Sequence, residues 1–91
     1  MISLNLLMQD KSYPESGSLL YDIIYQSIQN DQTIDIDMTG VVSLPSMFLN
    51  ATFGKAFSQF GVDSIKQKTK FFHISRSQAE RISEYFSRQG S

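Results

Sequence analysis

The apolar residues of this chain change their spacing several times, and each change marks the boundary of a predicted element. Ile2, Leu4 and Leu6 alternate with polar residues, which is the spacing of a half-buried β-strand. Residues 33–38 alternate in the same way, with isoleucine and methionine on one face and threonine and aspartate on the other. We therefore expect a first strand over residues 2–6 and a second over residues 33–38.

Helical spacing follows each of these strands. The apolar residues that recur on one helix face between the strands are Leu20, Ile23, Ile24 and Ile28. They predict a helix from about residue 17 to residue 29. A second helix is expected from about Ser46 to Phe60, because apolar residues again recur at helical spacing and Gly61 follows where a left-handed C-terminal cap is expected.

The last part of the chain predicts one more strand and one more helix. Residues 69–74 are rich in strand-forming residues, and we expect Phe72 and Ile74 on the core face with Phe71 and His73 on the opposite face. Residues 62–68 are interpreted as an irregular connection.

A capping pattern predicts where the last helix begins. Ser77 and Glu80 have the spacing of a capping box, in which each side chain bonds the other residue's main chain. We expect that helix to end at Gly90. Its expected core residues are Ala79, Ile82 and Phe86.

This order of elements predicts an α/β fold in one domain, residues 1–91, with a small three-stranded, mainly parallel sheet (β-α-β-α-β-α). Right-handed crossovers in the same direction place their helices on the same side of a sheet. The alternation in the first two strands leaves the other face without helices. The strands should lie in the order 1-2-3. The predicted core face consists of Ile2, Leu4, Leu6, Ile34, Ile36, Met38, Phe72 and Ile74.

Composition narrows the class of protein. The chain is 41% hydrophobic and 19% charged, as in an ordinary globular domain. It has no cysteine, which excludes disulfides and thiolate metal sites and favours a reducing compartment. The first residues lack the features of a secretory signal, and no apolar stretch approaches the length of a membrane span. We expect a cytoplasmic protein with no membrane partner.

The charges are unevenly distributed along the chain. Residues 1–54 have one lysine against six acids, and residues 55–91 have seven basic residues against three acids, so the two parts carry net charges of −5 and +4. Such polarity steers a partner, complements a second copy of the chain, or is neutralised within one fold.

The usual catalytic and ligand-binding patterns do not occur. His73 has no carboxylate at helical spacing and is interpreted as solvated. Asp35 and Asp37 are read as alternating acids on a solvated face rather than as a metal site. Three lysines in residues 66–72 and a pI near 5.6 do not suggest nucleic-acid binding. We expect no enzyme, no cofactor, no metal and no nucleic-acid partner.

The most informative stretch is DMTGVVSLPSMFLNATFG, residues 37–54, where a strand leads into a helix. Ser46 stands at the start of that helix. A serine there either caps the helix or is a site of phosphorylation, because a helix N-terminus favours negative charge.

This stretch resembles the signature of the STAS domains (sulphate transporter and anti-sigma factor antagonist). In the antagonists an acid ends a strand, a small residue and often a glycine follow, and the first serine of Asp-Ser-Ser-Gly is phosphorylated by a kinase. The resemblance places the acid on Asp37, the small residue on Thr39, the glycine on Gly40 and the phosphorylated serine on Ser46.

More closely, the chain resembles the bacterial STAS-like domains of unknown function, whose pattern fits SMFLNATFG. The resemblance covers about residues 30–90. Pro45 stands where the antagonists have aspartate, and Phe48 where they have glycine.

The resemblance implies a non-catalytic interaction module of bacterial signalling. Its protein partner is expected to be a histidine-kinase-like ATPase or an anti-sigma factor, and phosphorylation of Ser46 would be its switch. The residues expected to bind the partner are Ser43, Pro45, Ser46, Met47 and Asn50.

The alternative hypothesis is a structural subunit that self-associates, as a homodimer or within a larger complex, through its open sheet face or an edge strand. An antiparallel twofold arrangement would bring each acidic half to the other's basic half. The residues expected on this face are Phe71, His73, Asp35 and Thr33.

Overall fold

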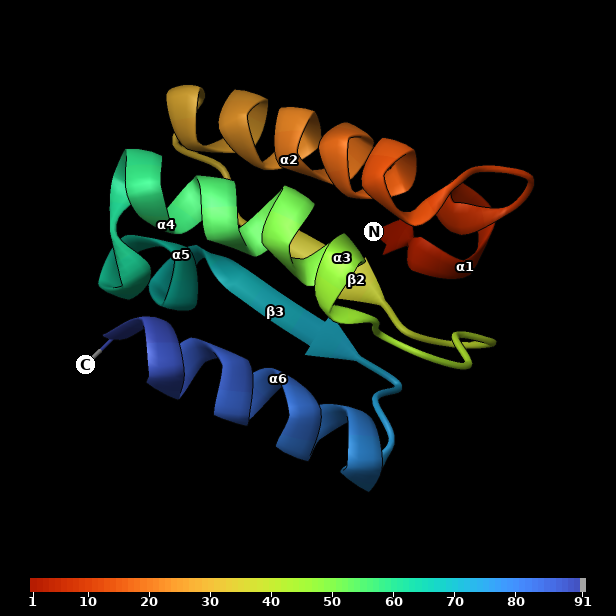
Figure 1. Ribbon diagram of the computed structural model, residues 1–91. Helices are drawn as coiled ribbons and strands as arrows, with labels where there is room; N and C mark the ends of the chain where they lie inside the picture. Colours follow the sequence, from red (N-terminus) through yellow and green to blue (C-terminus); the bar gives the residue numbers. More distant parts are fainter. Residues whose placement is uncertain (91) are drawn as a thin grey trace.

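The computed structural model describes residues 1–90, which form an α/β fold with a three-stranded sheet (Figure 1). The elements, in chain order, are β1 (Ile2–Ser3), α1 (Leu4–Met8), α2 (Tyr13–Gln29), β2 (Ile34–Asp37), α3 (Ser46–Leu49), the π-helical turn η1 (Asn50–Gly54), α4 (Lys55–Phe60), α5 (Val62–Lys68), β3 (Thr69–Phe72) and α6 (Arg76–Gly90).

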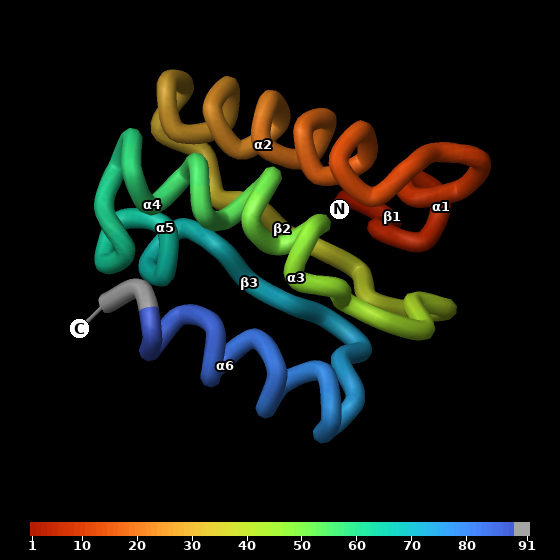
Figure 2. The backbone as a smooth tube through the Cα atoms, in the orientation of Figure 1, coloured from red at the N-terminus to blue at the C-terminus, as the bar shows by residue number. Residues whose placement is uncertain are grey.

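The sheet has the predicted topology. All three strands are parallel and lie in the order β1-β2-β3. In Figure 2 the chain passes through helical segments between each strand and the next, so each connection is a crossover. One continuous core joins the isoleucines of β2 to α2, to the segment from α3 to α4, and to α6. These helices therefore cover one face of the sheet.

The first strand is shorter than predicted. Ser3 pairs with Asp37, the last residue of β2, so no strand residue remains for a longer β1 to pair with. The Ser3 hydroxyl instead caps α1 by accepting a hydrogen bond of 3.4 Å from the amide of Leu6. Leu4 is buried, but Leu6 is 63% exposed. The assignment of Leu6 to the core face of the sheet was therefore wrong.

Two helix starts also differ from the prediction, because other serines cap them. The hydroxyl of Ser12 accepts a hydrogen bond of 3.2 Å from the amide of Glu15, so α2 begins at Tyr13. At α6 the capping box consists of Ser75 and Gln78, whose side chains and amides bond each other at 3.1 and 3.2 Å.

The predicted middle helix, residues 46–60, is helical throughout but contains the π-helical turn η1. Gly61 follows with a positive φ of 86°, but its ψ of 152° is extended, so the predicted left-handed cap does not form. Residues 62–68, predicted as an irregular connection, form α5, and Ile65 anchors that helix because its side chain is fully buried.

The faces of β3 are the reverse of the prediction. Phe71 pairs in register with Ile36, so its side chain lies on the core face, where its ring is 6.1 Å from that of Phe53. Phe72 pairs with Asp37 and lies on the open face. Because two phenylalanines are adjacent here, the sequence does not alternate and could not show which of them faces the core.

His73 explains why Ile74 still reaches the core. Its φ of 55° interrupts the strand alternation, and Ile74 packs against the core as predicted. Phe71 therefore does not lie on the open face, where it was predicted. Asp35 stays on that face in register with Lys70, and Thr33 is exposed just before β2.

Ala79 is a further correction, because it is exposed on α6, where Tyr85 is buried instead.

Candidate functional site: the junction between β2 and α3

The connection from β2 to α3 is held against α6 by two long polar side chains. Arg81 donates from Nε to the carbonyl oxygen of Leu44 at 3.1 Å. Gln78 donates from Nε2 to the carbonyl oxygen of Val41 at 2.7 Å. The side chain of Leu44 is buried, which fixes the connection from the core side as well. The loop is therefore braced although it contains no regular structure.

Ser46 lies at the first position of α3 and does not cap the helix. The residue before it, Pro45, occupies the cap position, and its carbonyl accepts the amides of Phe48 and Leu49 at 3.0 and 3.1 Å. The Ser46 hydroxyl instead accepts a hydrogen bond of 3.0 Å from Nη2 of Arg81. The capping interpretation was therefore wrong, because the serine stands one position too late.

The five residues predicted to bind a partner lie together in sequence around this junction, and most are exposed. Ser43, Ser46, Met47 and Asn50 are exposed, and Pro45 is half-buried. The side-chain oxygen of Asn50 accepts a hydrogen bond of 2.6 Å from the hydroxyl of Tyr85 on α6. Burial raises the pKa of the Tyr85 phenol above its usual value.

Sequence reasoning missed Val42, which is the most exposed of the large apolar residues described. Its side chain is 95% exposed, and that of Met47 is 59% exposed. Val41 beside it is half-buried and packs against the core. Two adjacent valines in a loop gave no periodicity, so the sequence could not show which one faces outward.

Hollows flank the braced loop on both sides. One, of about 310 Å³, lies between the loop and the start of α6, where Ser77, Gln78 and Arg81 line it. The other, of about 210 Å³, lies between the loop and the region of α1, with Asn5 and Met8 in its lining. Val42 and Ser43 line both hollows, so they stand on a ridge between them.

A polar cluster stabilises the start of the same connection. Asp37 accepts hydrogen bonds through Oδ1 from the hydroxyl and the amide of Thr39, at 2.7 and 3.0 Å. Nδ1 of His73 lies 3.0 Å from the same oxygen. These bonds, those from Thr39 first, lower the pKa of the Asp37 carboxyl to about 2. His73 is exposed, as predicted, but it has a carboxylate partner on the neighbouring strand, because parallel, in-register strands bring their ends together.

Asp37 and His73 alone do not make a metal centre. Within residues 1–90, no three histidine, cysteine or acidic residues are grouped so that they could hold a metal ion.

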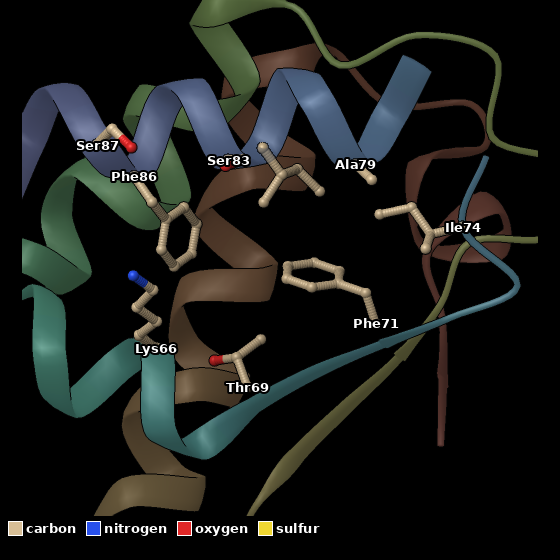
Figure 3. Close-up of a pocket in the computed structure, with 9 residues that line it drawn as sticks. Lys66, Thr69, Phe71, Ile74, Ala79, Ser83, Phe86 and Ser87 are labelled. Atoms are coloured by element: carbon tan, nitrogen blue, oxygen red, sulfur yellow. The ribbon is translucent and has the colours of Figure 1, made fainter. Parts of the chain in front are cut away.

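A further pocket lies away from the junction, between β3 and α6 (Figure 3). Its volume is about 370 Å³, and its apolar lining residues are Phe71, Ile74, Ala79, Ile82 and Phe86. This pocket was not predicted from the sequence.

In the part of the chain that the structure describes, no helix is both long and apolar enough to cross a membrane.

A family model described as a STAS-like domain of unknown function matches residues 16–79, which extend from within α2 through β2 and β3 into the start of α6. No curated protein and no solved structure matches the chain. The matched range includes β2, the braced loop, Ser46 and β3.

Proposed function

This chain belongs to the family of STAS-like domains of unknown function, and from that premise we propose that it is a non-catalytic module that binds a protein partner through the junction between β2 and α3. Ser43, Pro45, Ser46, Met47 and Asn50 supply the surface, together with Val42.

The observation that carries this proposal is exposed apolar surface on a braced loop. Val42 and Met47 expose most of their side chains, although each stands next to a residue that is packed in the core. Because Arg81 and Gln78 already fix the loop, little conformational entropy is lost when a partner binds it. Apolar side chains on a rigid support with a polar rim are typical of binding surfaces.

Ser46 is the proposed switch. Its hydroxyl is exposed and lies 3.0 Å from the Arg81 guanidinium, at the start of helical structure that continues to Phe60. A phosphate on Ser46 would be stabilised by both the guanidinium and the helix N-terminus. The phosphate would compete with the Leu44 carbonyl for Arg81 and so loosen the loop on which Val42 stands.

The partner that we propose is a histidine-kinase-like ATPase or an anti-sigma factor in a bacterial cytoplasm, as the resemblance to the anti-sigma factor antagonists implies. Such an ATPase would both bind the surface and phosphorylate Ser46.

The test compares two charge substitutions at the junction with a matched one elsewhere. Val42→Asp and Met47→Asp should abolish binding to a candidate ATPase encoded beside this protein, as measured by calorimetry. Leu6→Asp, at a residue with exposure similar to that of Met47 but on α1, should leave binding unchanged. Equal loss in all three variants, or no loss at the junction, would contradict the proposal.

Phosphorylation is tested in the same system. Incubation with ATP and the ATPase should add one phosphate to the wild-type protein and none to Ser46→Ala, as read by intact mass. Ser46→Asp should bind the ATPase more weakly. Unchanged affinity of the aspartate variant would leave a binding module without this switch.

Self-association through the open sheet face is a second candidate, favoured by a specific feature of that face. Asp35 has one buried carboxylate oxygen without a hydrogen-bond partner among the described residues, and Phe72 lies on the same face. A second copy would cover the exposed part of Phe72. Light scattering at about 0.1 and 1 M salt tests it, because a dimer guided by opposite charges loosens as salt rises. A monomer in both buffers would remove this candidate.

A further inference from the structure

The third strand has a free edge, and α6 runs alongside it. β3 pairs with β2 on one side only. Figure 1 shows α6 running along β3 on the side away from α3 and α4. Each of the two crossovers places helices between two strands that pair with each other. In contrast, α6 follows β3, the last strand of the sheet. A fourth strand in the same order would lie beside β3, next to α6.

An apolar pocket lies at that vacant position. Phe71 and Thr69 of β3 form one wall, and Ile82 and Phe86 of α6 form the other (Figure 3). The hydroxyl of Thr69 is buried and has no hydrogen-bond partner among the described residues. At about 370 Å³ the pocket has room for one or two large side chains of an incoming segment.

The main chain of β3 offers hydrogen bonds to the same position. The carbonyl oxygen of Phe72 accepts the amide of Met38, so the main-chain groups of Phe72 point toward β2. Because successive residues of a strand alternate, the amide and carbonyl of Phe71 point to the free edge. Phe71 therefore presents both a main-chain pairing site and a side chain in the pocket.

We propose that the free edge of β3 binds an extended segment of a partner protein as a fourth strand, and that this segment alternates apolar and acidic residues. Its apolar side chains enter the pocket between β3 and α6. Its acidic side chains lie on the open face of the sheet and meet Lys70 of β3.

The charges select acids for the incoming strand. Within residues 1–90, Lys66 at the pocket and Lys70 on β3 have no ion-pair partner, whereas Lys68 pairs with Asp31. On its other side, β3 already pairs with an alternating strand of this kind: β2 reads Ile-Asp-Ile-Asp, and Asp35 is in register with Lys70. An incoming strand with the same alternation would place its apolar side chains on the pocket side of β3 and its acidic side chains on the open face.

A second copy of this chain fits the edge poorly. Pairing β3 with another β3 would bring Lys70 of one copy close to Lys70 of the other, which like-charge repulsion opposes. β1, the other edge of the sheet, has only two residues before α1 begins. The occupant is therefore a different chain.

This site is separate from the junction. Gln78 and Arg81 reach from α6 to the braced loop, whereas Ile82 and Phe86 of the same helix line the pocket. The proposal therefore stands whether or not the junction binds a partner.

The probe for the test is a blocked synthetic peptide with the sequence of residues 33–38, Thr-Ile-Asp-Ile-Asp-Met, added to isotope-labelled protein at up to about 1 mM, a range that detects weak binding. The amides of β3 and of the pocket side of α6 should shift in the NMR spectrum. A second peptide with both aspartates replaced by lysine should shift them about tenfold more weakly.

Charge reversal on the protein should exchange these preferences. Lys70→Glu should bind the lysine peptide better than the aspartate peptide. Ser83→Phe, which fills the pocket from α6, should abolish binding, and Ser58→Phe, an equal change at an exposed position on α4, should not.

Main-chain pairing is tested with two N-methylated versions of the aspartate peptide, one methylated on the isoleucines and one on the aspartates. The isoleucine amides and the aspartate amides of a strand point to opposite sides, so only one of the two sets can pair with β3. Methylation of that set should abolish binding, and methylation of the other set should not.

Four results would overturn the proposal. They are an unshifted β3 up to the highest peptide concentration, equal binding of the aspartate and lysine peptides, equal binding of the two methylated peptides, and self-association of the protein through β3. Equal binding of all peptides would indicate an apolar pocket for small molecules.

Discussion

The hydroxyl of Thr52 donates a buried hydrogen bond of 2.6 Å to the main-chain carbonyl oxygen of Gly17. This bond joins the π-helical turn η1 to the first turns of α2, where the two helices are closest. A Cβ atom on Gly17 would lie 2.7 Å from Cβ of Ala51 and 2.8 Å from the carbonyl oxygen of Phe48. The glycine is therefore required for the approach of the two helices that cover the first two strands.

Gly17→Ala should destabilise the protein. Alanine is favoured over glycine inside a helix by about 1 kcal/mol, but here the added methyl meets a backbone oxygen and a neighbouring Cβ that cannot move independently. We expect the free energy of unfolding to fall by about 2 kcal/mol in urea titrations. Gly54→Ala is the matched control and should cost less, because its new Cβ first meets the end of the Tyr85 side chain at 3.1 Å. Equal costs would show that the close approach is unimportant.

The register of β3 predicts different costs for two adjacent phenylalanines. Phe71→Ala should lower the free energy of unfolding by about 3 kcal/mol, because its ring packs against Phe53 in the core. Phe72→Ala, on the open face, should cost only about 1 kcal/mol. Both are measured by urea unfolding. The reverse order of costs would contradict the register.

The pKa of Asp37 should be measurable directly by NMR titration of its carboxyl carbon. We expect a midpoint of about 2, because Thr39 and His73 bond the ionised form. Thr39→Val removes the hydroxyl and should raise the pKa more than His73→Gln does, because the Thr39 hydroxyl is the largest cause. A pKa near 3.8 in the wild-type protein would mean that these bonds do not form in solution.

The same shift gives the protein a defined loss of stability in acid. The folded-state pKa lies below the unfolded value of 3.8, so the contribution of Asp37 is fully present above pH 3.8 and is lost as the pH falls toward about 2. In Asp37→Asn this part of the pH dependence should be absent from the urea midpoints.

A double-mutant cycle tests the bond between Ser46 and Arg81. Ser46→Ala should cost about 0.5 kcal/mol in the wild-type background and nothing in an Arg81→Ala background, because Arg81 is the partner of its hydroxyl. A helix-capping serine would instead cost about 1 kcal/mol in both backgrounds. Arg81→Ala should also speed hydrogen exchange at the amides of residues 41–44 and of Ser46, since it frees the Leu44 carbonyl.

Regular alternation and helical spacing made most of the fold predictable. The four residues of β2 have one apolar and one polar face, and pairing on both sides confirms that assignment. Prediction failed where two similar residues are adjacent. Phe71 and Phe72 offered no alternation, and Val41 and Val42 offered none either. In both pairs tertiary packing decides which side chain, Phe71 or Val41, lies against the core.

The site was only partly predictable, because its bonds join residues far apart in the sequence. The sequence predicted that Ser46 lies at a helix start. It could not predict the hydrogen bond to Arg81, because Arg81 lies on another helix. His73 meets Asp37 only because two strands align. Local signals also misled at helix starts: two serines suitable for capping, Ser75 and Ser77, lie at the start of α6, and the structure uses Ser75.

The sequential order of the strands has a consequence for how the chain folds during synthesis. Each strand pairs with the one made just before it, and the helix between them is complete by then. The growing chain can therefore assemble β1, α2 and β2 while α6 is still inside the ribosome, and no earlier pairing has to be undone. Until α6 emerges, however, the rings of Phe53, Phe57 and Phe71 lack the cover of Phe86 and its neighbours. The last helix thus closes the core, and premature release before it is made would leave an aromatic surface prone to aggregation.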